Sequence, residues 1–115
     1  MSSPEQLDQT LAALADPVRR RAVELLASRP HRAGELAEAL GVAPPAMSKH
    51  LRILRQRGIV SEQSPDFDTR VRIYSLRSAP MADLRSWLAA AERGWAQQLT
   101  AFAEHLDNKH LGVDQ

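Results

Sequence analysis

The sequence predicts a mainly α-helical fold that carries one β-hairpin. Apolar residues recur every three or four positions in five stretches, which is the spacing of a helix with one buried face. Residues 59–60 and 70–76, which are rich in β-branched side chains, enclose a turn-forming segment at 64–69, a pattern typical of a hairpin. Residues 34–58 place a short helix, a tight link with Gly41 and a second helix in succession, which predicts a helix-turn-helix.

The first helix is expected from Pro4 to about Leu14. Ser3 can cap it, Pro4 suits its first position, and Gln6 stands three residues after the cap, as in a capping box. One apolar stripe then follows at Leu7, Leu11 and Leu14.

The second helix is expected at residues 17–28, with Asp16 as its cap and Pro17 at its first position. Its beginning carries Arg19, Arg20 and Arg21, although the helix dipole disfavours cations there. We therefore expect another partner for these arginines, either a carboxylate in the fold or a phosphate.

The third helix, residues 33–40, has no Ser, Thr or Asp at its start, so a poorly capped first turn is expected. Gly41 can close this helix in the left-handed conformation. Because a residue before proline avoids the helical region, the next helix is expected to begin at Pro45, with Pro44 in the cap position.

The helix from Pro45 to about residue 57 combines an apolar face with a basic one. Met47, Leu51 and Leu54 form the face to be buried. Polar and basic residues lie on the other side and its flanks: Ser48, Lys49, Arg52, Arg55 and Arg57. Residues 41–58 contain no Asp or Glu, and residues 17–58 carry nine Arg or Lys against three Glu, although the whole chain has a net charge of only +1. This distribution attracts a polyanion, so duplex DNA is the expected ligand and this is the expected recognition helix.

The hairpin after this helix has the place of a wing, with Arg70 near its tip. Asp66 and Asp68 weaken the positive potential there. Phe67, between them, is expected to fold back on the hairpin; the alternative is a Phe67 exposed for a partner. The expected DNA-contacting residues are Pro45, Ser48, Lys49, His50, Arg52, Arg70 and Arg72. For His50 a place at the buried edge, beside Leu51 and Leu54, stays open.

The last helix is expected from Ala79–Pro80 to about Leu106, with an apolar stripe too long for so small a core. Such a stripe is expected to meet its own copy in a twofold dimer. The expected dimerisation residues are Leu7, Leu11, Leu84, Trp87, Leu88, Ala91, Trp95 and Leu99. A neighbouring helix beside Trp95 would explain Gly94, which otherwise weakens a helix by about 1 kcal/mol. Residues 1–107 are thus expected to be one DNA-binding and dimerisation domain, and residues 108–115 a frayed tail.

Composition narrows the function classes. The 115 residues contain no cysteine, no run long enough to span a membrane and no apolar leader, so a soluble cytoplasmic protein is expected. An enzyme is disfavoured, because Ser48 and His50 do not face each other on a helix and no paired carboxylates or phosphate-binding Gly loop occur. No cofactor is expected. Glu104, His105, Asp107 and His110 are read as surface groups rather than metal ligands.

The chain from Leu11 to about Leu99 resembles the ArsR/SmtB-type winged helix-turn-helix repressors. The matching sequence segments are Leu14-Ala15-Asp16-Pro17-Val18-Arg19-Arg20, Gly34-Glu35-Leu36-Ala37, Ser48-Lys49-His50-Leu51-Arg52-Ile53-Leu54 and Gly58-Ile59-Val60, followed by residues 70–76. The resemblance implies a homodimeric bacterial repressor with three helices, a recognition helix, a wing and a terminal helix in that order. It also implies that the outermost helices dimerise, that Ser48 and His50 lie near DNA, and that wing arginines contact the DNA backbone.

Two departures from the family pattern matter. The cysteine metal sites of similar proteins are impossible here, and a four-ligand zinc site across the dimer is poorly supplied, because residues 81–99 offer only Asp83 and Glu92. Pro44 and Pro45 stand where polar side chains are common, so base readout is expected to depend on Ser48, Lys49 and Arg52. A palindromic operator is expected. Whether an effector regulates binding is left open. The competing hypothesis is a winged helix that binds a protein or RNA.

Overall fold

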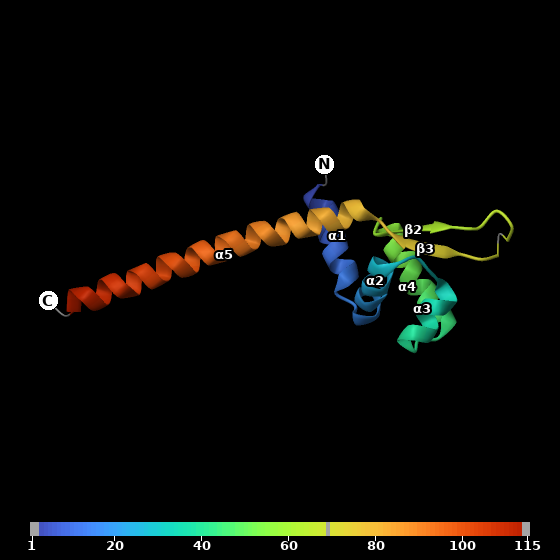
Figure 1. Ribbon diagram of the computed structural model, residues 1–115, viewed down its shortest axis with the longest axis horizontal. Helices are drawn as coiled ribbons and strands as arrows, with labels where there is room; N and C mark the ends of the chain where they lie inside the picture. Colours follow the sequence, from blue (N-terminus) through green and yellow to red (C-terminus); the bar gives the residue numbers. More distant parts are fainter. Residues whose placement is uncertain (1–2, 69, 114–115) are drawn as a thin grey trace. The chain divides into compact units, whose positions relative to one another are not determined.

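The computed structural model describes the backbone of residues 3–68 and 70–113 and the side chains of this range up to residue 108. The chain divides into two compact units, Met1–Asp83 and Leu84–Gln115. The expectation that residues 1–107 form a single domain stays a prediction. The elements in order are α1 (Pro4–Leu14), α2 (Pro17–Ser28), β1 (His31–Arg32), α3 (Ala33–Leu40), α4 (Pro44–Gln56), β2 (Val60–Gln63), β3 (Ile73–Leu76) and α5 (Ser78–Val113) (Figure 1). The predicted fold class, mainly α with a β wing, is confirmed.

The caps expected for α1 and α2 are present. The Ser3 hydroxyl accepts from the Gln6 amide at 3.1 Å, and the Asp16 carboxylate accepts from the amides of Val18 at 2.8 Å and Arg19 at 3.1 Å. The Gln6 side chain, however, does not bond to the backbone amide of Ser3, as a capping box requires. Its Nε2 donates to the carbonyl of Arg57, 51 residues away, and so ties the start of α1 to the end of α4.

Arginines at the start of α2 hold the end of α1. Arg19 Nε donates to the carbonyl of Ala13 at 2.8 Å, and Arg20 Nη1 to that of Leu14 at 3.0 Å. These carbonyls belong to the last turn of α1, where the helix itself supplies no donors and its dipole favours cations. For the side chains of these two residues the closest hydrogen-bond partners in the fold are thus backbone carbonyls, while a phosphate partner stays a prediction. Within the fold their partner is the negative end of the preceding helix.

The starts of α3 and α4 both lack a capping Ser, Thr or Asp. At α3 no cap side chain accepts from the first-turn amides, as expected, although the Glu35 carboxylate accepts from the backbone amide of Arg32 at 3.0 Å. The recognition helix α4 begins at Pro44, with Ala43 in the cap position, and not at Pro45. Amides of the first turn make no bonds within a helix, so two successive prolines cost none there, and their fixed φ suits the helix. Gly41 closes α3 at a φ of 65°, as predicted.

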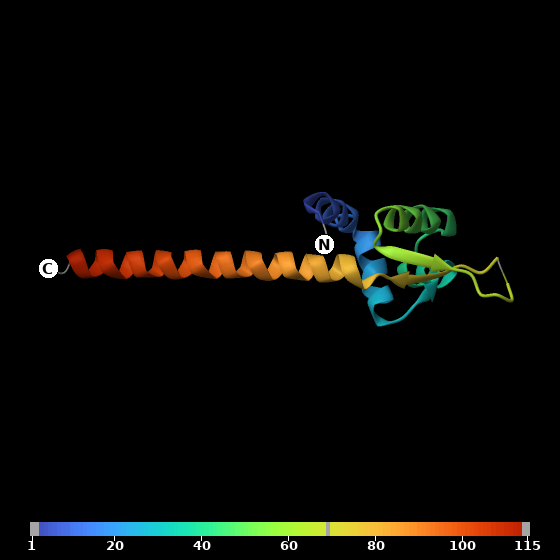
Figure 2. The same ribbon diagram turned by 90° about the horizontal axis from the view of Figure 1, so that it is seen from above.

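The wing belongs to a three-stranded antiparallel sheet in the order β1-β3-β2. In β2 and β3, Val60 pairs with Leu76 and Gln63 with Ile73, and Figure 2 shows both strands continuing into the long connecting segment. Strand β3 is shorter than the expected strand at 70–76, because pairing stops at Ile73. The third strand, β1, lies between the expected second and third helices and pairs His31 with Tyr74.

The core of the first unit is assembled mainly from α2, α3, α4 and β2. The fully buried apolar side chains are Ala22, Leu36, Met47, Leu51, Leu54 and Ile59. Burying each of the larger ones stabilises the fold by roughly 1.5–3 kcal/mol. The expectation that Met47, Leu51 and Leu54 face inward is confirmed, and this fixes which side of α4 faces outward.

Helix α5 reaches Val113, beyond the expected end near Leu106. Residues 114–115 lie outside the described residues. The expected frayed tail at 108–115 stays a prediction. In the second unit the large apolar side chains of α5 are exposed: Trp87, Leu88, Trp95, Leu99, Phe102 and Leu106. Apolar positions recur at an interval of 11 residues, which pairs Leu84 with Trp95 and Leu106, Leu88 with Leu99, and Ala91 with Phe102. An 11-residue interval favours a slight right-handed winding of packed helices. Within the described residues, no helix has the length and apolar character to cross a membrane.

Candidate nucleic-acid interface

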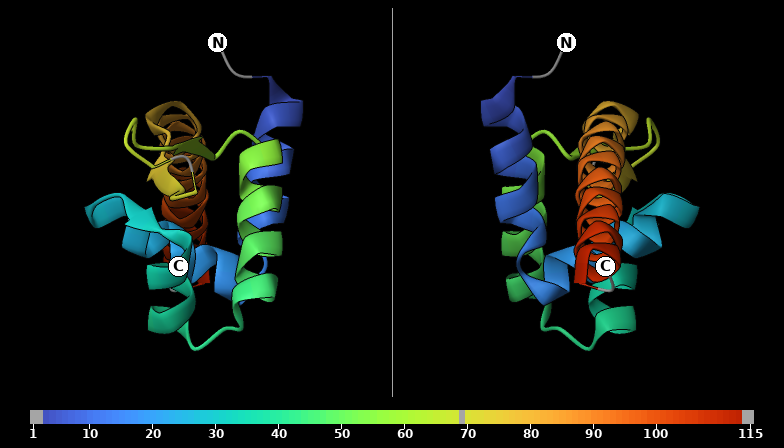
Figure 3. Two further views of the ribbon diagram at one scale, coloured as in Figure 1. Left: turned by 90° about the vertical axis from the view of Figure 1, so that its right-hand side faces the viewer. Right: turned by 90° about the vertical axis from the view of Figure 1, so that its left-hand side faces the viewer.

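The helix-turn-helix consists of α3, a tight turn and α4 (Figure 3). The turn is closed by the amide of Val42, which donates to the carbonyl of Ala37 at 2.9 Å, and by the amide of Gly41, which donates to that of Glu38 at 3.3 Å. These bonds satisfy the last carbonyls of α3 and fix the direction in which α4 starts. With Leu36, Ala37 and Met47 in the core, the turn holds α4 against α3 and leaves its other side free.

Four of the predicted DNA-contacting residues share the outward side of α4. Pro45, Ser48, Lys49 and Arg52 are all exposed. At about 100° of rotation per residue they occupy an arc of roughly 100°, opposite the buried face. In the part of the chain that the structure describes, the side chains of Lys49 and Arg52 have no hydrogen-bond or ion-pair partner. Both charges are therefore available to an external anion.

His50 lies on a flank of α4 that faces α2. It is half-buried, and its Nδ1 lies 3.4 Å from Arg19 Nη1. Its position is about 160° around the helix from Arg52. The structure thus brings His50 to the start of α2 and not to the arc of Pro45, Ser48, Lys49 and Arg52, which agrees with the buried-edge alternative for its position.

An acidic residue that the sequence analysis did not single out lies between α4 and the wing. Glu62 on β2 accepts from Arg55 of α4 at 2.9 Å and from the hydroxyl of Tyr74 at 3.2 Å, and it forms an ion pair with Arg72. Burial, together with the adjacent Glu62 carboxylate, raises the pKa of Tyr74. The cluster borders a polar hollow of about 340 Å³ lined also by Ser48 and Arg52. An acid on the strand after a basic helix is the only sequence signal for it.

Among the described wing residues beyond the paired strands, Asp66, Phe67, Arg70 and Arg72 are exposed. Arg70 donates from its backbone amide and from Nε to Asp68 at 3.0 and 3.2 Å, so the predicted contact residue is partly neutralised by its neighbour. Phe67 is 86% exposed, so the expectation that it folds back on the hairpin is wrong. Strand pairing ends at Gln63 and Ile73, which leaves Phe67 beyond the apolar surface on which it could pack.

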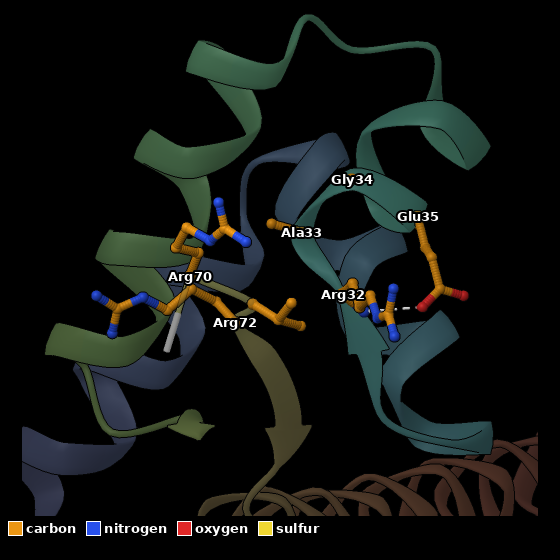
Figure 4. A pocket seen from close by; sticks show the side chains of 7 residues that line it. Arg32, Ala33, Gly34, Glu35, Arg70 and Arg72 are labelled. Atoms are coloured by element: carbon orange, nitrogen blue, oxygen red, sulfur yellow. Dashed lines mark hydrogen bonds between the residues drawn. The ribbon is translucent and has the colours of Figure 1, made fainter. Parts of the chain in front are cut away.

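Arg70 and Arg72 also face the start of α3 across a pocket of about 420 Å³ (Figure 4). Arg32 and Glu35 form the opposite side, joined by the capping hydrogen bond from the Arg32 amide. Hydrogen bonds from the Arg32 amide and from the Arg29 side chain lower the pKa of Glu35. The pocket is therefore lined by three arginines, Arg32, Arg70 and Arg72, and by the carboxylate of Glu35. Among the described residues, no three His, Asp or Glu side chains come close enough to hold a metal ion.

A helix-turn-helix with an exposed basic arc and an arginine-bearing wing defines the class of DNA-binding winged helices. Comparison with known proteins identifies the family within this class. Residues 16–62 match the family model described as "Bacterial regulatory protein, arsR family". HTH-type transcriptional regulator Rv2034 of Mycobacterium tuberculosis is 38% identical over 109 residues, which cover 95% of this chain and 96% of that protein. Transcriptional repressor SdpR of Bacillus subtilis is 29% identical over 82 residues, covering 71% of this chain and 88% of that protein.

Solved structures agree with these sequence matches. The ArsR family transcriptional regulator RHA00566 superimposes with a TM-score of 0.70 at 32% identity, over 83% of this chain and 95% of that one. An ArsR-like transcriptional regulator from Rhodococcus sp. RHA1 gives a TM-score of 0.68 at 26% identity, over 85% and 90%. The chain belongs to the ArsR family. It is a transcriptional regulator with a DNA-binding helix-turn-helix and not an enzyme, as predicted.

Proposed function

We propose that this regulator is a cytoplasmic homodimeric repressor. Its two copies of α4 enter successive major grooves, about 34 Å apart, of a palindromic operator. The observation that carries this proposal is the outward arc of α4, where the exposed Lys49 and Arg52 have no partner among the described residues. A relative named as a transcriptional repressor supports repression, for which steric exclusion from the promoter is the simplest mechanism.

Each predicted contact residue has a role suited to its chemistry. Lys49 and Arg52 bind phosphates or guanine, and Ser48 makes a short hydrogen bond to a base or phosphate. Pro45 has no N–H and offers apolar contact, for which a thymine methyl group is suited. Arg70 and Arg72 bind phosphates from the wing. His50, turned toward α2, contributes at the edge of the interface.

The double variant Lys49→Ala plus Arg52→Ala tests the interface through its salt dependence. Each lost phosphate contact flattens the slope of log affinity against log salt by about 0.9. We expect a slope flatter by about 1.8 per protomer in a fluorescence-anisotropy titration with a duplex selected from genomic fragments, beginning with the protein's own promoter. Arg85→Ala plus Arg93→Ala removes the same charge from exposed positions of α5 and should leave the slope unchanged. An unchanged slope for the α4 variant would exclude these phosphate contacts.

The dimer is proposed to form through the exposed apolar face of α5, together with Leu7 and Leu11 of α1. Leu84, Trp87, Leu88, Ala91, Trp95 and Leu99 are the α5 residues of this interface. The exposure of several of these large side chains in one chain supports a second copy as the cover. Replacing Trp87 and Trp95 by Gln should give monomers in analytical ultracentrifugation. Gln97→Ala, about 160° around α5 from Trp95, should remain dimeric. An intact dimer of the tryptophan variant would refute this interface.

A second candidate function follows from the exposed Phe67 at the wing tip. A winged helix that docks a protein or RNA through this residue should show little preference between duplex sequences. A major-groove reader should prefer its selected duplex over random duplex by at least about a thousandfold. Measuring this ratio with the wild-type protein decides between the two.

A further inference from the structure

One carboxylate holds two arginines from different elements on the proposed DNA-binding side. Glu62 Oε2 accepts from Arg55 Nη1 at 2.9 Å and from the Tyr74 hydroxyl at 3.2 Å, while Oε1 accepts from Arg72 Nη1. The Glu62 side chain is only 9% exposed, whereas those of Arg55 and Arg72 are 60% and 58% exposed. The acid is thus enclosed and the two guanidinium groups remain open to a ligand.

The first consequence of this arrangement is positional. Arg55 lies on α4 and Arg72 on the approach to β3, so the shared carboxylate fixes the wing side of the interface relative to the recognition helix. A guanidinium has five N–H donors, of which these bonds use only some. The remaining donors lie at the polar hollow between α4 and the sheet, which Ser48 and Arg52 also line.

The second consequence is electrostatic. Glu62 reduces the charge of the cluster from two positive charges to one. Binding to random duplex depends almost entirely on neutralised phosphates, so an acid at the interface lowers affinity for every sequence. Binding to a matching site gains, in addition, from donors that are already held in place.

We propose, on the basis of the proposed function, that Glu62 is a positioning residue that sets sequence selectivity. It holds Arg55 and Arg72 in one arrangement for the operator, and it withholds one positive charge from random DNA. Removing the acid should therefore strengthen random binding without strengthening specific binding to the same extent. If Glu62 only stabilised the fold, its replacement would change both affinities by the same factor and would leave the preference for the selected duplex unchanged.

The test uses three variants of the full chain. Glu62→Gln removes the charge and most of the anchoring, Glu62→Asp keeps the charge but is one methylene shorter, and Glu24→Gln removes an exposed acid from α2 as the charge-matched control. Affinities for the selected duplex and for random duplex are measured by fluorescence anisotropy from 0.05 to about 0.3 M salt, a range over which one phosphate contact changes affinity severalfold. Thermal unfolding of each variant checks that it is folded.

For Glu62→Gln we expect random-duplex affinity to rise by up to about eightfold per protomer near 0.1 M salt, with a slope steeper by about 0.9. The preference for the selected duplex should fall by a similar factor. Glu62→Asp should keep wild-type affinity for random duplex and lose affinity for the selected one, and it tests the positioning role if Glu62→Gln is unfolded. Glu24→Gln should match the wild type in both.

An unchanged preference in Glu62→Gln would overturn the inference, as would equal gains on both duplexes or the same effect in Glu24→Gln. A folded Glu62→Asp variant with wild-type preference would overturn it as well. If the wild-type protein itself shows no preference, the proposed function fails and the inference falls with it. If the wild type shows its preference and the Glu62 variants do not alter it, only the inference fails.

Discussion

Removing the carboxylate of Asp16 should destabilise the protein at the junction of α1 and α2. Asp16→Ala leaves the amides of Val18 and Arg19, now bonded at 2.8 and 3.1 Å, without their acceptor. Loss of such a cap costs about 1 kcal/mol, within a range of 0.5–2. For a unit of this size, about 1 kcal/mol lowers the melting temperature by roughly 4–8 °C. Circular dichroism at 222 nm, at fixed protein concentration and pH 7, measures the shift.

The same carboxylate predicts how the effect changes with pH. The hydrogen bond from the Arg19 amide, followed by that from Val18 and the charges of His50 and Arg19, lowers the pKa of Asp16 below its ordinary 3.8, while partial burial opposes this. A lowered pKa in the folded state means that the stabilisation is complete above the ordinary pKa and is lost as the pH falls through the folded-state value. The difference between wild type and Asp16→Ala should therefore shrink below pH 3.8.

Asp16→Asn separates the cap from its charge. Asn caps a helix about as well as Asp, so this variant should melt near the wild type at pH 7 and should lack the part of the acid-dependent loss that belongs to Asp16. The reasoning would be refuted by an Asp16→Ala protein that melts like the wild type at neutral pH. It would also fail if the gap between the two proteins widened on acidification.

Three further substitutions test the packing. Leu51→Ala, at a fully buried position of α4, should lower the free energy of unfolding by roughly 3 kcal/mol in a urea titration, and a cost below 1 kcal/mol would contradict its place in the core. Gly58→Ala should cost about 1–2 kcal/mol, because Gly58 has a φ of 77° and an added Cβ would lie 3.4 Å from Arg77 Nη1. Gly34→Ala, where an added Cβ meets nothing within 4 Å, should be neutral or stabilising by up to about 1 kcal/mol, and it serves as the control for Gly58.

Local sequence patterns predicted much of the fold. The spacing of Met47, Leu51 and Leu54 predicted which side of the recognition helix is buried, and from this the outward arc of Ser48, Lys49 and Arg52 followed. The caps at Ser3 and Asp16 involve neighbours at most three residues away, so the sequence already contained both partners. Structural features that depend only on residues within one or two helical turns can therefore be predicted from a single sequence.

Features that depend on distant partners were not predicted. Strand β1 exists because β3, some forty residues later, offers it a pairing edge, and two residues alone give no periodic signal. Glu62 acquires its place from Arg55, Arg72 and Tyr74 on two other segments. Helix α4 starts at Pro44 and not at Pro45, because amides of the first helical turn need no partner within the helix, and this outweighs the preference of a residue before proline for the extended region.

The 11-residue interval along α5 bears on how a second helix could align with it. The interval defines three series of positions: Leu84, Trp95 and Leu106; Leu88 and Leu99; Ala91 and Phe102. If the second helix slides by one interval, about 16 Å, the first two series again place a large apolar side chain at each contact. The series of Ala91 and Phe102 changes most in size, from a methyl group to a phenyl ring, and Trp87 has no apolar counterpart, because Gln98 stands 11 residues later. Correct alignment of two α5 helices would therefore depend on these two contrasts, and removing both would permit a staggered assembly with its DNA-reading ends displaced.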